Sequence, residues 1–253
     1  MFIIESPVVE KILVQDNVFL LKIHSPEIAS VIKPAQFLNI RVSSKSYPLL
    51  RRPFSVCDVE GEDIYLLFNI FGEGTRILAG KSSGDLIDIL GPLGNGFILN
   101  DDYEIAVIVA GGLGSAPFPF VTRELNDKKE IMSFIGGRTS KDVITYGMKN
   151  VFTASDDGTA GFKGTVVDLL SSKIDELKKK SIKVFGCGPT SMLKALKEFC
   201  VKQNIVCEVS AECAMACGFG ICQGCPIEST NNREKYLLVC KDGPVFNVQD
   251  VVI

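Results

Sequence analysis

Four cysteines near the C-terminus have a spacing that can hold an iron–sulfur cluster. Cys217, Cys222 and Cys225 read C-x4-C-x2-C, and Cys240 follows at a distance. This is the plant-type pattern for a [2Fe–2S] cluster. Glycines at positions 218, 220 and 224 suit a tight loop whose N–H groups turn toward cluster sulfurs. The pattern predicts these four cysteines as metal ligands, and it requires an electron donor or acceptor elsewhere in the chain.

Other interpretations of the cysteines stay open. Structural zinc sites usually pair two C-x2-C motifs, and only Cys222 and Cys225 have that spacing. Disulfides are disfavoured, because nine cysteines and an N-terminus without a visible signal peptide indicate a reducing, cytoplasmic location. Cys213 is a rival ligand four residues before Cys217. The plant-type register selects Cys217 and leaves Cys213 for packing, while the role of Cys207 stays open.

Composition excludes several classes of protein. The 253 residues are 46% hydrophobic and carry a net charge of −3, which is ordinary for a globular chain with room for two or three domains. No basic patch indicates a nucleic-acid partner. The longest apolar run, Ile105 to Ala110, is too short to cross a membrane. The single histidine, His24, cannot build a histidine metal site or a Ser-His-Asp triad.

The first hundred residues favour an antiparallel barrel that contains a candidate flavin site. An arginine suits a pyrophosphate, and a nearby strand hydroxyl can face a flavin ring, as in Arg52-Pro53-Phe54-Ser55. The alternative is a charged edge strand stopped by proline. The glycine-rich turn at Gly74-Thr75 supports the phosphate interpretation. The predicted strands are Val8–Leu13, Val18–Ile23, Phe37–Val42, Phe54–Asp58 and Ile64–Phe71.

The middle of the chain changes to repeated strand–turn–helix units, which predict a parallel sheet. The apolar strand Ile105–Ala110 ends in a glycine turn and a helix, an arrangement that binds phosphates. The match to G-x-G-x-x-G is imperfect, because Pro117 stands at the third glycine. The acidic residue expected about 20 positions later is missing. A later strand ends in Cys187-Gly188-Pro189, and the alternative for Cys187 is a buried small residue.

These motifs together resemble the ferredoxin–NAD(P) reductase superfamily. The resemblance implies a β plus α/β fold: an antiparallel FAD-binding β-barrel (1–99), a Rossmann-like NAD domain (100–206) and a small [2Fe–2S] domain (207–253). It implies catalytic positions for Ser55 and Cys187, the latter beside the nicotinamide. It assigns FAD to Arg52, Pro53, Phe54, Ser55, Leu67, Phe68, Asn69, Gly74 and Thr75, and NAD to Gly111, Gly112, Gly114, Cys187, Gly188 and Pro189.

The cysteine loop and the ending Cys240-Lys-Asp-Gly-Pro-Val-Phe246 narrow the resemblance. They resemble the family of electron-transfer subunits of NAD-linked dihydroorotate dehydrogenase, an oxidoreductase of pyrimidine biosynthesis. The family implies a catalytic FMN subunit as partner, in a heterotetramer of two plus two. Electrons would then pass from FMN through the cluster and FAD to NAD+. Alternatives are a subunit of another complex (of the ferredoxin:NADP reductase or sulfide dehydrogenase type), an oxygenase reductase, or a non-redox module with structural zinc.

Overall fold

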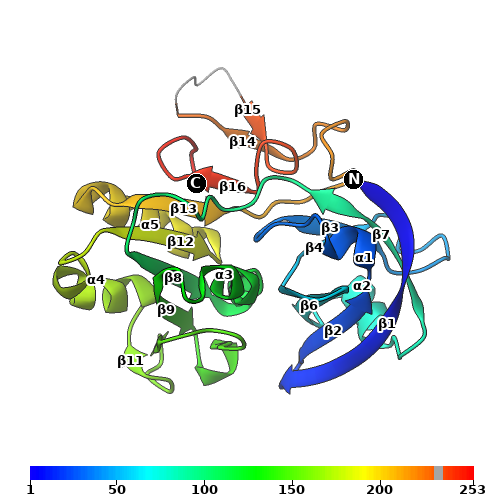
Figure 1. Ribbon diagram of the computed structural model, residues 1–253, viewed down its shortest axis with the longest axis horizontal. Helices are drawn as coiled ribbons and strands as arrows, with labels where there is room; N and C mark the ends of the chain where they lie inside the picture. Colours follow the sequence, from blue (N-terminus) through cyan, green and yellow to red (C-terminus); the bar gives the residue numbers. More distant parts are fainter. Residues whose placement is uncertain (231–235) are drawn as a thin grey trace.

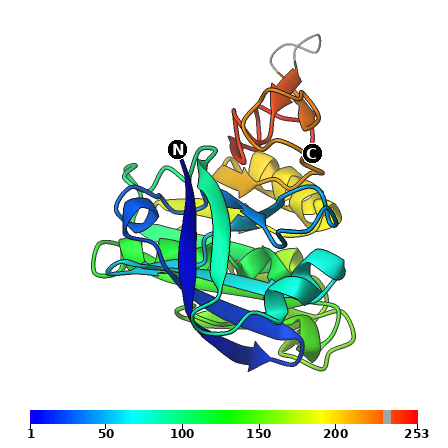
Figure 2. The ribbon, with the colours of Figure 1, turned by 90° about the vertical axis from the view of Figure 1, so that its right-hand side faces the viewer.

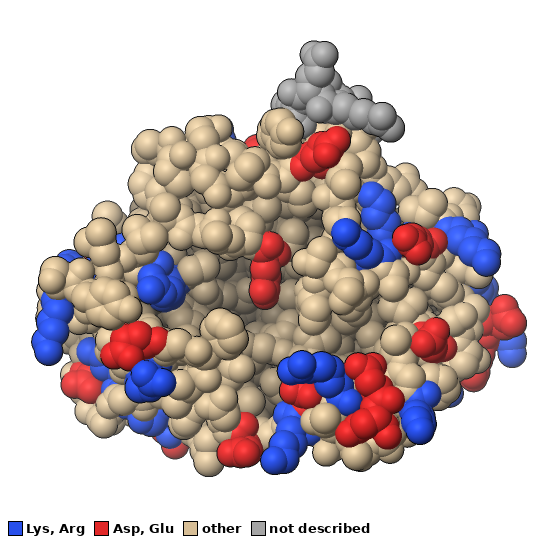
Figure 3. All heavy atoms as spheres, turned by 180° about the vertical axis from the view of Figure 1, so that it is seen from behind, with Lys and Arg blue, Asp and Glu red and all other residues tan. Residues whose placement is uncertain are grey.

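The computed structural model describes residues 1–230 and 236–253. Two sheets stand side by side, and the C-terminal strands lie above both of them (Figure 1). A view turned by 90° shows the same C-terminal part projecting from one end of the molecule (Figure 2). The face opposite to that of Figure 1 is hollowed between the two halves (Figure 3). This arrangement puts the cysteine loop next to both sheets.

The N-terminal half is a seven-stranded antiparallel sheet in the order β4-β3-β7-β1-β2-β6-β5. The end strands of this order, β4 and β5, follow each other directly in the chain, so the sheet curls into a barrel. The chain passes from one end of this strand order to the other at Val56 and Cys57. There, Val56 N–H donates to Gln36 O and Cys57 N–H donates to Tyr65 O. The elements are β1 (Phe2–Gln15), β2 (Val18–His24), α1 (Pro26–Ala29), β3 (Phe37–Arg41), β4 (Arg52–Ser55), β5 (Asp58–Glu60), β6 (Asp63–Asn69), α2 (Glu73–Ala79) and β7 (Leu86–Leu93).

The predicted barrel is confirmed, with two differences in its strands. The predicted strand Phe54–Asp58 is interrupted, because the backbone changes pairing partner at Val56 and Cys57. Strand β7 was not predicted, although it pairs with both β1 and β3 and is central to the sheet. Its sequence contains Gly91-Pro92, which reads as a turn unless the strand partners are known.

The second half is a seven-stranded sheet in the order β11-β10-β9-β8-β12-β13-β16, parallel except for β16. This confirms the predicted parallel sheet with crossover helices. The elements are β8 (Ile105–Gly111), η1 (Gly112–Ser115), α3 (Phe118–Leu125), β9 (Glu130–Gly137), η2 (Ser140–Asp142), β10 (Val151–Ser155), β11 (Phe162–Lys163), α4 (Val166–Leu177), β12 (Ile182–Cys187), α5 (Thr190–Gln203), β13 (Val206–Ser210) and β16 (Val245–Asn247).

Alternate residues of β8 face two different cores. Val107 and Val109 pack against the side of α4 and α5, whereas Ala106 and Ile108 pack against the side of α3. All seven residues of β8 are therefore buried, which explains the continuous apolar run in the sequence. Helix α3 also touches the barrel, because Phe120 N–H donates to Cys57 O. Helix α3 thus fixes the glycine turn of the second sheet relative to the flavin strand of the first.

The cysteine loop leaves the second sheet after β13 and returns to it at β16. Between them lies the small hairpin of β14 (Pro226–Glu228) and β15 (Tyr236–Leu238). The expected division at residues 206/207 therefore falls at the start of β13, a strand of the parallel sheet. Among the residues that the structure describes, no helix is long and apolar enough to span a membrane.

Candidate functional site

The four predicted ligand cysteines lie together as two pairs. The Sγ atoms of Cys225 and Cys240 are 3.2 Å apart, and Cys240 N–H lies 3.4 Å from Cys225 Sγ. In the second pair, Cys222 N–H lies 3.5 Å from Cys217 Sγ. Two thiol pairs fit the two-iron arrangement of a [2Fe–2S] cluster.

The backbone around Cys217 favours its thiolate form. Burial alone would raise the pKa of this thiol, but N–H groups of Cys222, Phe219 and Ile221 outweigh burial and lower the pKa to about 6. Donors that stabilise a thiolate also suit a thiolate bound to iron. The loop reaches this conformation because Gly218 and Gly220 have φ of +82° and +90°. The chemistry of this donor set therefore fits the predicted cluster.

The barrel holds the cysteine loop through Asn39 of β3. Asn39 Nδ2 donates to Cys217 O at 3.0 Å, although 178 residues separate them in the chain. Asn39 is fully buried, and a Cβ added to Gly218 would lie 2.3 Å from Asn39 Nδ2. Only glycine at position 218 allows this close approach. No sequence pattern predicted this contact.

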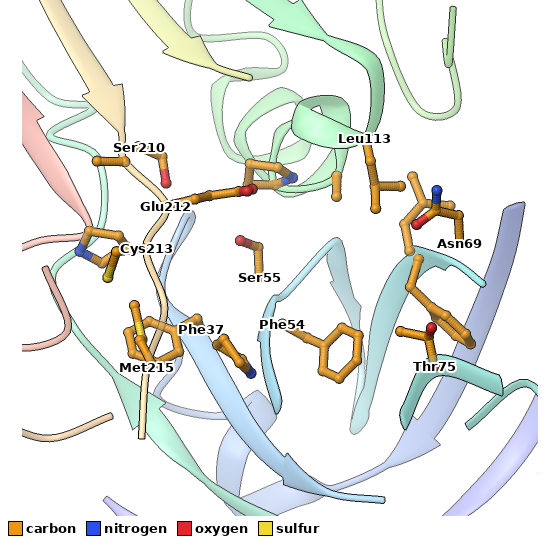
Figure 4. A pocket seen from close by; sticks show the side chains of 17 residues that line it. Phe37, Phe54, Ser55, Asn69, Thr75, Leu113, Ser210, Glu212, Cys213 and Met215 are labelled. Carbon is orange, nitrogen blue, oxygen red and sulfur yellow. The ribbon is translucent and has the colours of Figure 1, made fainter. Parts of the chain in front are cut away.

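A cavity of about 240 Å³ lies between β4, β6, η1 and the segment after β13. Figure 4 shows Ser55 at its centre, with Glu212 extending toward Ser55 from the opposite wall. Seventeen residues line it, among them the predicted flavin residues Pro53, Phe54, Ser55, Leu67, Phe68, Asn69 and Thr75. Seven of the nine predicted FAD positions therefore share one cavity.

The walls of this cavity suit a flat aromatic ring. Phe37, Phe54 and Leu67 supply apolar surface, and the side chains of Ser55 and Asn69 make no hydrogen bond within the described chain. The volume is below the 300–1,000 Å³ typical of whole-ligand pockets. A cavity of this size can hold the flavin ring of FAD but not the whole cofactor.

Arg52 and Gly74, the other two predicted FAD positions, lie together beside the cavity. A Cβ on Gly74 would meet Arg52 Nε at 3.1 Å, so the arginine lies over the first turn of α2. Arg52 Nη1 also donates to Leu50 O at 2.6 Å, which holds the guanidinium in place. Thr75 Oγ1 accepts from Phe71 N–H and Gly72 N–H, so its first role is to cap α2.

A second cavity, of about 660 Å³, lies at the carboxyl ends of β8, β9 and β10. Gly111, Gly112 and Pro189 line it, as predicted for NAD. Gly112 has a φ of +56°, and no heavy atom lies within 4 Å of the Cβ it lacks. The turn therefore exposes its backbone to a cavity large enough for a nucleotide, and these residues fit the predicted dinucleotide.

Gly114, Cys187 and Gly188 do not line either cavity, and the structure gives them packing roles. A Cβ on Gly114 would meet Cys187 O at 2.4 Å, so this glycine lets the turn approach the end of β12. Cys187 is buried, and burial raises the pKa of its thiol, an effect that the nearby Glu212 carboxylate strengthens and a hydrogen bond with Ser210 opposes. A catalytic role for Cys187 stays a prediction, with a neutral thiol.

The two cavities and the cysteine pairs are contiguous. Leu113 lines both cavities. At the other end of the smaller cavity, Cys213 lines the wall and packs in one apolar cluster with Cys225 and Cys240. The order in space is therefore larger cavity, smaller cavity, thiol pairs. The smaller cavity is in the middle, although the strands that line it come first in the sequence.

The chain is similar to known proteins. Residues 212–252 match the family model for the iron–sulfur cluster binding domain of dihydroorotate dehydrogenase B. The electron transfer subunit of dihydroorotate dehydrogenase B (NAD(+)) from Bacillus velezensis is 35% identical over 95% of this chain and 95% of its own. That from Desulforamulus reducens is 33% identical over 99% and 98%. The chain belongs to the family of dihydroorotate dehydrogenase B electron transfer subunits. The family resemblance predicted from the sequence is confirmed.

Solved structures of other proteins are similar in fold to this chain. A structure of an NADH-dependent reduced ferredoxin–NADP oxidoreductase, studied for flavin-based electron bifurcation, is similar with a TM-score of 0.86 and 28% identity, over 98% of this chain and 89% of that one. A ferredoxin reductase of carbazole 1,9a-dioxygenase has a TM-score of 0.63 at 18% identity, over 81% and 66%. This second likeness shows the fold alone.

Several residues that line the two cavities were not among the predicted site residues. Phe37, Glu212 and Met215 line the smaller cavity, and Arg138 and Asp156 line the larger one. Burial raises the pKa of the Glu212 carboxyl group. No motif marks these residues, because their side chains reach the cavities from separate elements. The one available signal was position, since Arg138 and Asp156 directly follow the ends of β9 and β10.

Proposed function

We propose that this chain is the electron-transfer subunit of an NAD-linked dihydroorotate dehydrogenase. It takes single electrons at the cysteine loop and delivers them in pairs to NAD+. The observation that carries the proposal is the contiguous order of thiol pairs, flavin cavity and dinucleotide cavity, joined at Cys213 and Leu113. When bound, FAD can exchange both single electrons and a hydride. The cluster exchanges only single electrons, and the nicotinamide exchanges only a hydride.

The chain's own residues hold and orient these groups. Cys217 and Cys222, which lie together, would hold one iron of the cluster, and Cys225 and Cys240 would hold the other. Phe54 and Leu67 place the flavin ring, while Ser55 and Asn69 supply free polar groups at its edge. The backbone at Gly111 and Gly112 receives the dinucleotide phosphates. Leu113 lines both cavities, so a flavin in the smaller one and a nicotinamide in the larger one would have this side chain between them.

Dihydroorotate oxidation requires a separate catalytic subunit that contains FMN. The relatives of this chain are named electron transfer subunits, a name that implies a catalytic partner. The cysteine loop presents Cys222 and Ile221 to solvent, and Ile221 is 77% exposed. An exposed apolar residue beside a cluster suits a partner surface. We place the catalytic subunit there, in a heterotetramer of two plus two in the cytoplasm.

Purification of the native complex tests the proposal. We expect flavin absorbance, a rhombic cluster signal after reduction, and NAD+ reduction that depends on dihydroorotate. Cys222→Ser should abolish the rhombic signal and transfer, whereas Cys57→Ser, a buried cysteine of the barrel, should retain both. Zinc without iron, or another dehydrogenase as the bound partner, contradicts the proposal.

The high similarity to the ferredoxin–NADP oxidoreductase favours one second candidate, a flavin and cluster subunit of a related NAD(P)H-linked complex. The two candidates differ in the electron source and in the nucleotide. NADP+ reduction with reduced ferredoxin, and none with dihydroorotate and its catalytic subunit, would select the second candidate.

A further inference from the structure

The segment that leaves β7 holds a turn near the C-terminus through one residue. Asn95 Nδ2 donates to Lys241 O at 3.1 Å and to Asp242 O at 3.0 Å, across 146 and 147 positions of the chain. The backbone N–H of Asn95 donates to Gly243 O at 2.6 Å. Both partners of the side chain are carbonyl oxygens, so its amide nitrogen must face them. Asn95 therefore binds three consecutive residues of this turn.

The same turn joins a predicted cluster ligand to a wall of the smaller cavity. Cys240 directly precedes the turn, and Pro244 at its end lines the cavity. The segment of Asn95 passes beside β16 and forms an isolated parallel bridge with Pro244 (Figure 1). A Cβ added to Gly94 would lie 2.5 Å from Pro244 Cδ and 3.0 Å from Phe37 Cε1, and Phe37 is another wall residue. A movement of the turn would therefore displace the ligand and the cavity wall together.

The barrel and its exit segment thus hold the cysteine loop at two separate places. Asn39 binds Cys217 O beside the first thiol pair, and Asn95 binds the turn that follows Cys240 of the second pair. Asn39 is buried, whereas Asn95 is exposed to solvent. Loss of the Asn95 side chain leaves no cavity in a core, so it should open the turn without unfolding the barrel.

We propose that Asn95 is a positioning residue that fixes the turn at residues 241–244 against the barrel exit, and thereby keeps the ligand Cys240 and the cavity wall at Pro244 in place together. This inference rests on the proposed function, because it requires the cluster and the flavin. Contact of a flavin with Pro244 opposes opening of the turn, and so does the bond between Cys240 and iron. Each cofactor therefore stabilises the binding of the other by the same factor.

Release of iron and of FAD from the full chain with its cofactors tests this inference. Asn95→Ala removes the donor, and we expect iron loss to an excess of chelator to become about threefold to tenfold faster, which is the effect of one hydrogen bond. Asn95→Asp keeps the shape but turns a carboxylate oxygen toward two carbonyl oxygens, so iron loss should be faster still. The dissociation constant of FAD should rise in both variants.

Asn100 provides the matched control for both substitutions. It is an exposed asparagine of the same segment, and its side chain makes no hydrogen bond within residues 1–230 and 236–253. Asn100→Ala and Asn100→Asp should change neither iron loss nor FAD binding. A readout that does not depend on iron is hydrogen exchange at the amide of Asp242, which donates to Leu238 O at 2.8 Å. This exchange should be faster in Asn95→Asp than in Asn100→Asp.

The outcomes separate this inference from the proposed function. Iron content and the rhombic signal of the unchanged protein test the cluster itself. If these are present and Asn95→Asp loses iron no faster than Asn100→Asp, the inference is wrong while the proposed function stands. Faster iron loss with an unchanged FAD dissociation constant would also overturn it, since the turn would not then join the two sites. A loss of global stability in urea equal to the change in iron release would show that Asn95 acts on the whole fold, and it would overturn the positioning role.

Discussion

The contact between the barrel and the cysteine loop predicts a large effect for one added methyl group. Gly218→Ala places a Cβ 2.3 Å from Asn39 Nδ2, which donates to Cys217 O. Alanine at a φ of +82° costs about 1–2 kcal/mol by itself. Displacing the buried Asn39 amide adds about 1–3 kcal/mol, because a buried polar group loses its hydrogen bond.

Gly220→Ala is the matched control for the backbone term. Its φ is +90°, but the nearest atom to the added Cβ is Lys241 Cδ at 3.0 Å, at the flexible end of a side chain. The two variants share the cost of positive φ and differ in the Asn39 contact. We therefore expect Gly218→Ala to lose about 1–3 kcal/mol more than Gly220→Ala, a further 5- to 150-fold in the population of open loops.

Cluster loss to an excess of a strong iron chelator, followed by visible absorbance, measures this population, because the loop must open before iron leaves. A double-mutant cycle with Asn39→Ala isolates the contact. Once the amide is removed, Gly218→Ala should cost no more than Gly220→Ala. Equal loss rates for Gly218→Ala and Gly220→Ala in the unchanged background would refute the reasoning.

Three further predictions concern the two halves of the molecule and the loop. Arg123 of α3 donates to both carboxylate oxygens of Asp58 of β5 at 2.7 Å. Arg123→Ala should lower the free energy of unfolding by about 1–3 kcal/mol, and Arg123→Lys should lower it by less. Urea unfolding measures both variants. The buried Lys183 pairs with Glu208 at 2.9 Å. Lys183→Met should cost about 3–5 kcal/mol in the same assay, because it leaves the Glu208 carboxylate buried without its partner, and adding Glu208→Gln should recover part of this loss. No recovery in the double variant would contradict the explanation by an uncompensated buried charge. In the iron-free protein, burial raises the pKa of the Cys217 thiol but N–H donors outweigh burial and lower the pKa to about 6, so this thiol should react with iodoacetamide at pH 7 faster than the other cysteines, and its rate should level off above pH 7 and fall as the pH drops through 6, because the thiolate is then protonated. Peptide mapping that shows the Cys217 rate still rising about tenfold per pH unit up to pH 8 would contradict this prediction.

The sequence predicted the elements whose residues carry periodic or local signals. The apolar run Ile105–Ala110 gave the buried strand β8, since a strand covered on both faces has no polar side. The spacing of Cys217, Cys222 and Cys225 indicated the cluster, because a tight loop brings ligands together within a few residues. Family motifs carried the remaining predictions for flavin and NAD, and seven of the FAD positions share a cavity.

Other predicted residues were near the site without lining it. Gly114 and Gly188 belong to glycine motifs, yet both are needed for close packing, since a Cβ on either would approach neighbouring atoms within 3 Å. A motif gives a residue's type and spacing but not whether the space beside it belongs to a ligand or to another part of the protein. Strand β7 was missed for a related reason, because its partners β1 and β3 are distant in sequence.

By itself, the sequence determined the two sheet types and the family of this protein, and it predicted the ligand cysteines, because each depends on residues that are close in the chain or on motifs. Only the tertiary structure decided the order of the sites. It brought Leu113 to both cavities, Asn39 to the cysteine loop, and Cys213 to the smaller cavity and to the apolar cluster that contains Cys225 and Cys240. These contacts join residues from separate elements, and packing of the two halves against the C-terminal segment sets their distances. No pattern within a single segment can encode that packing.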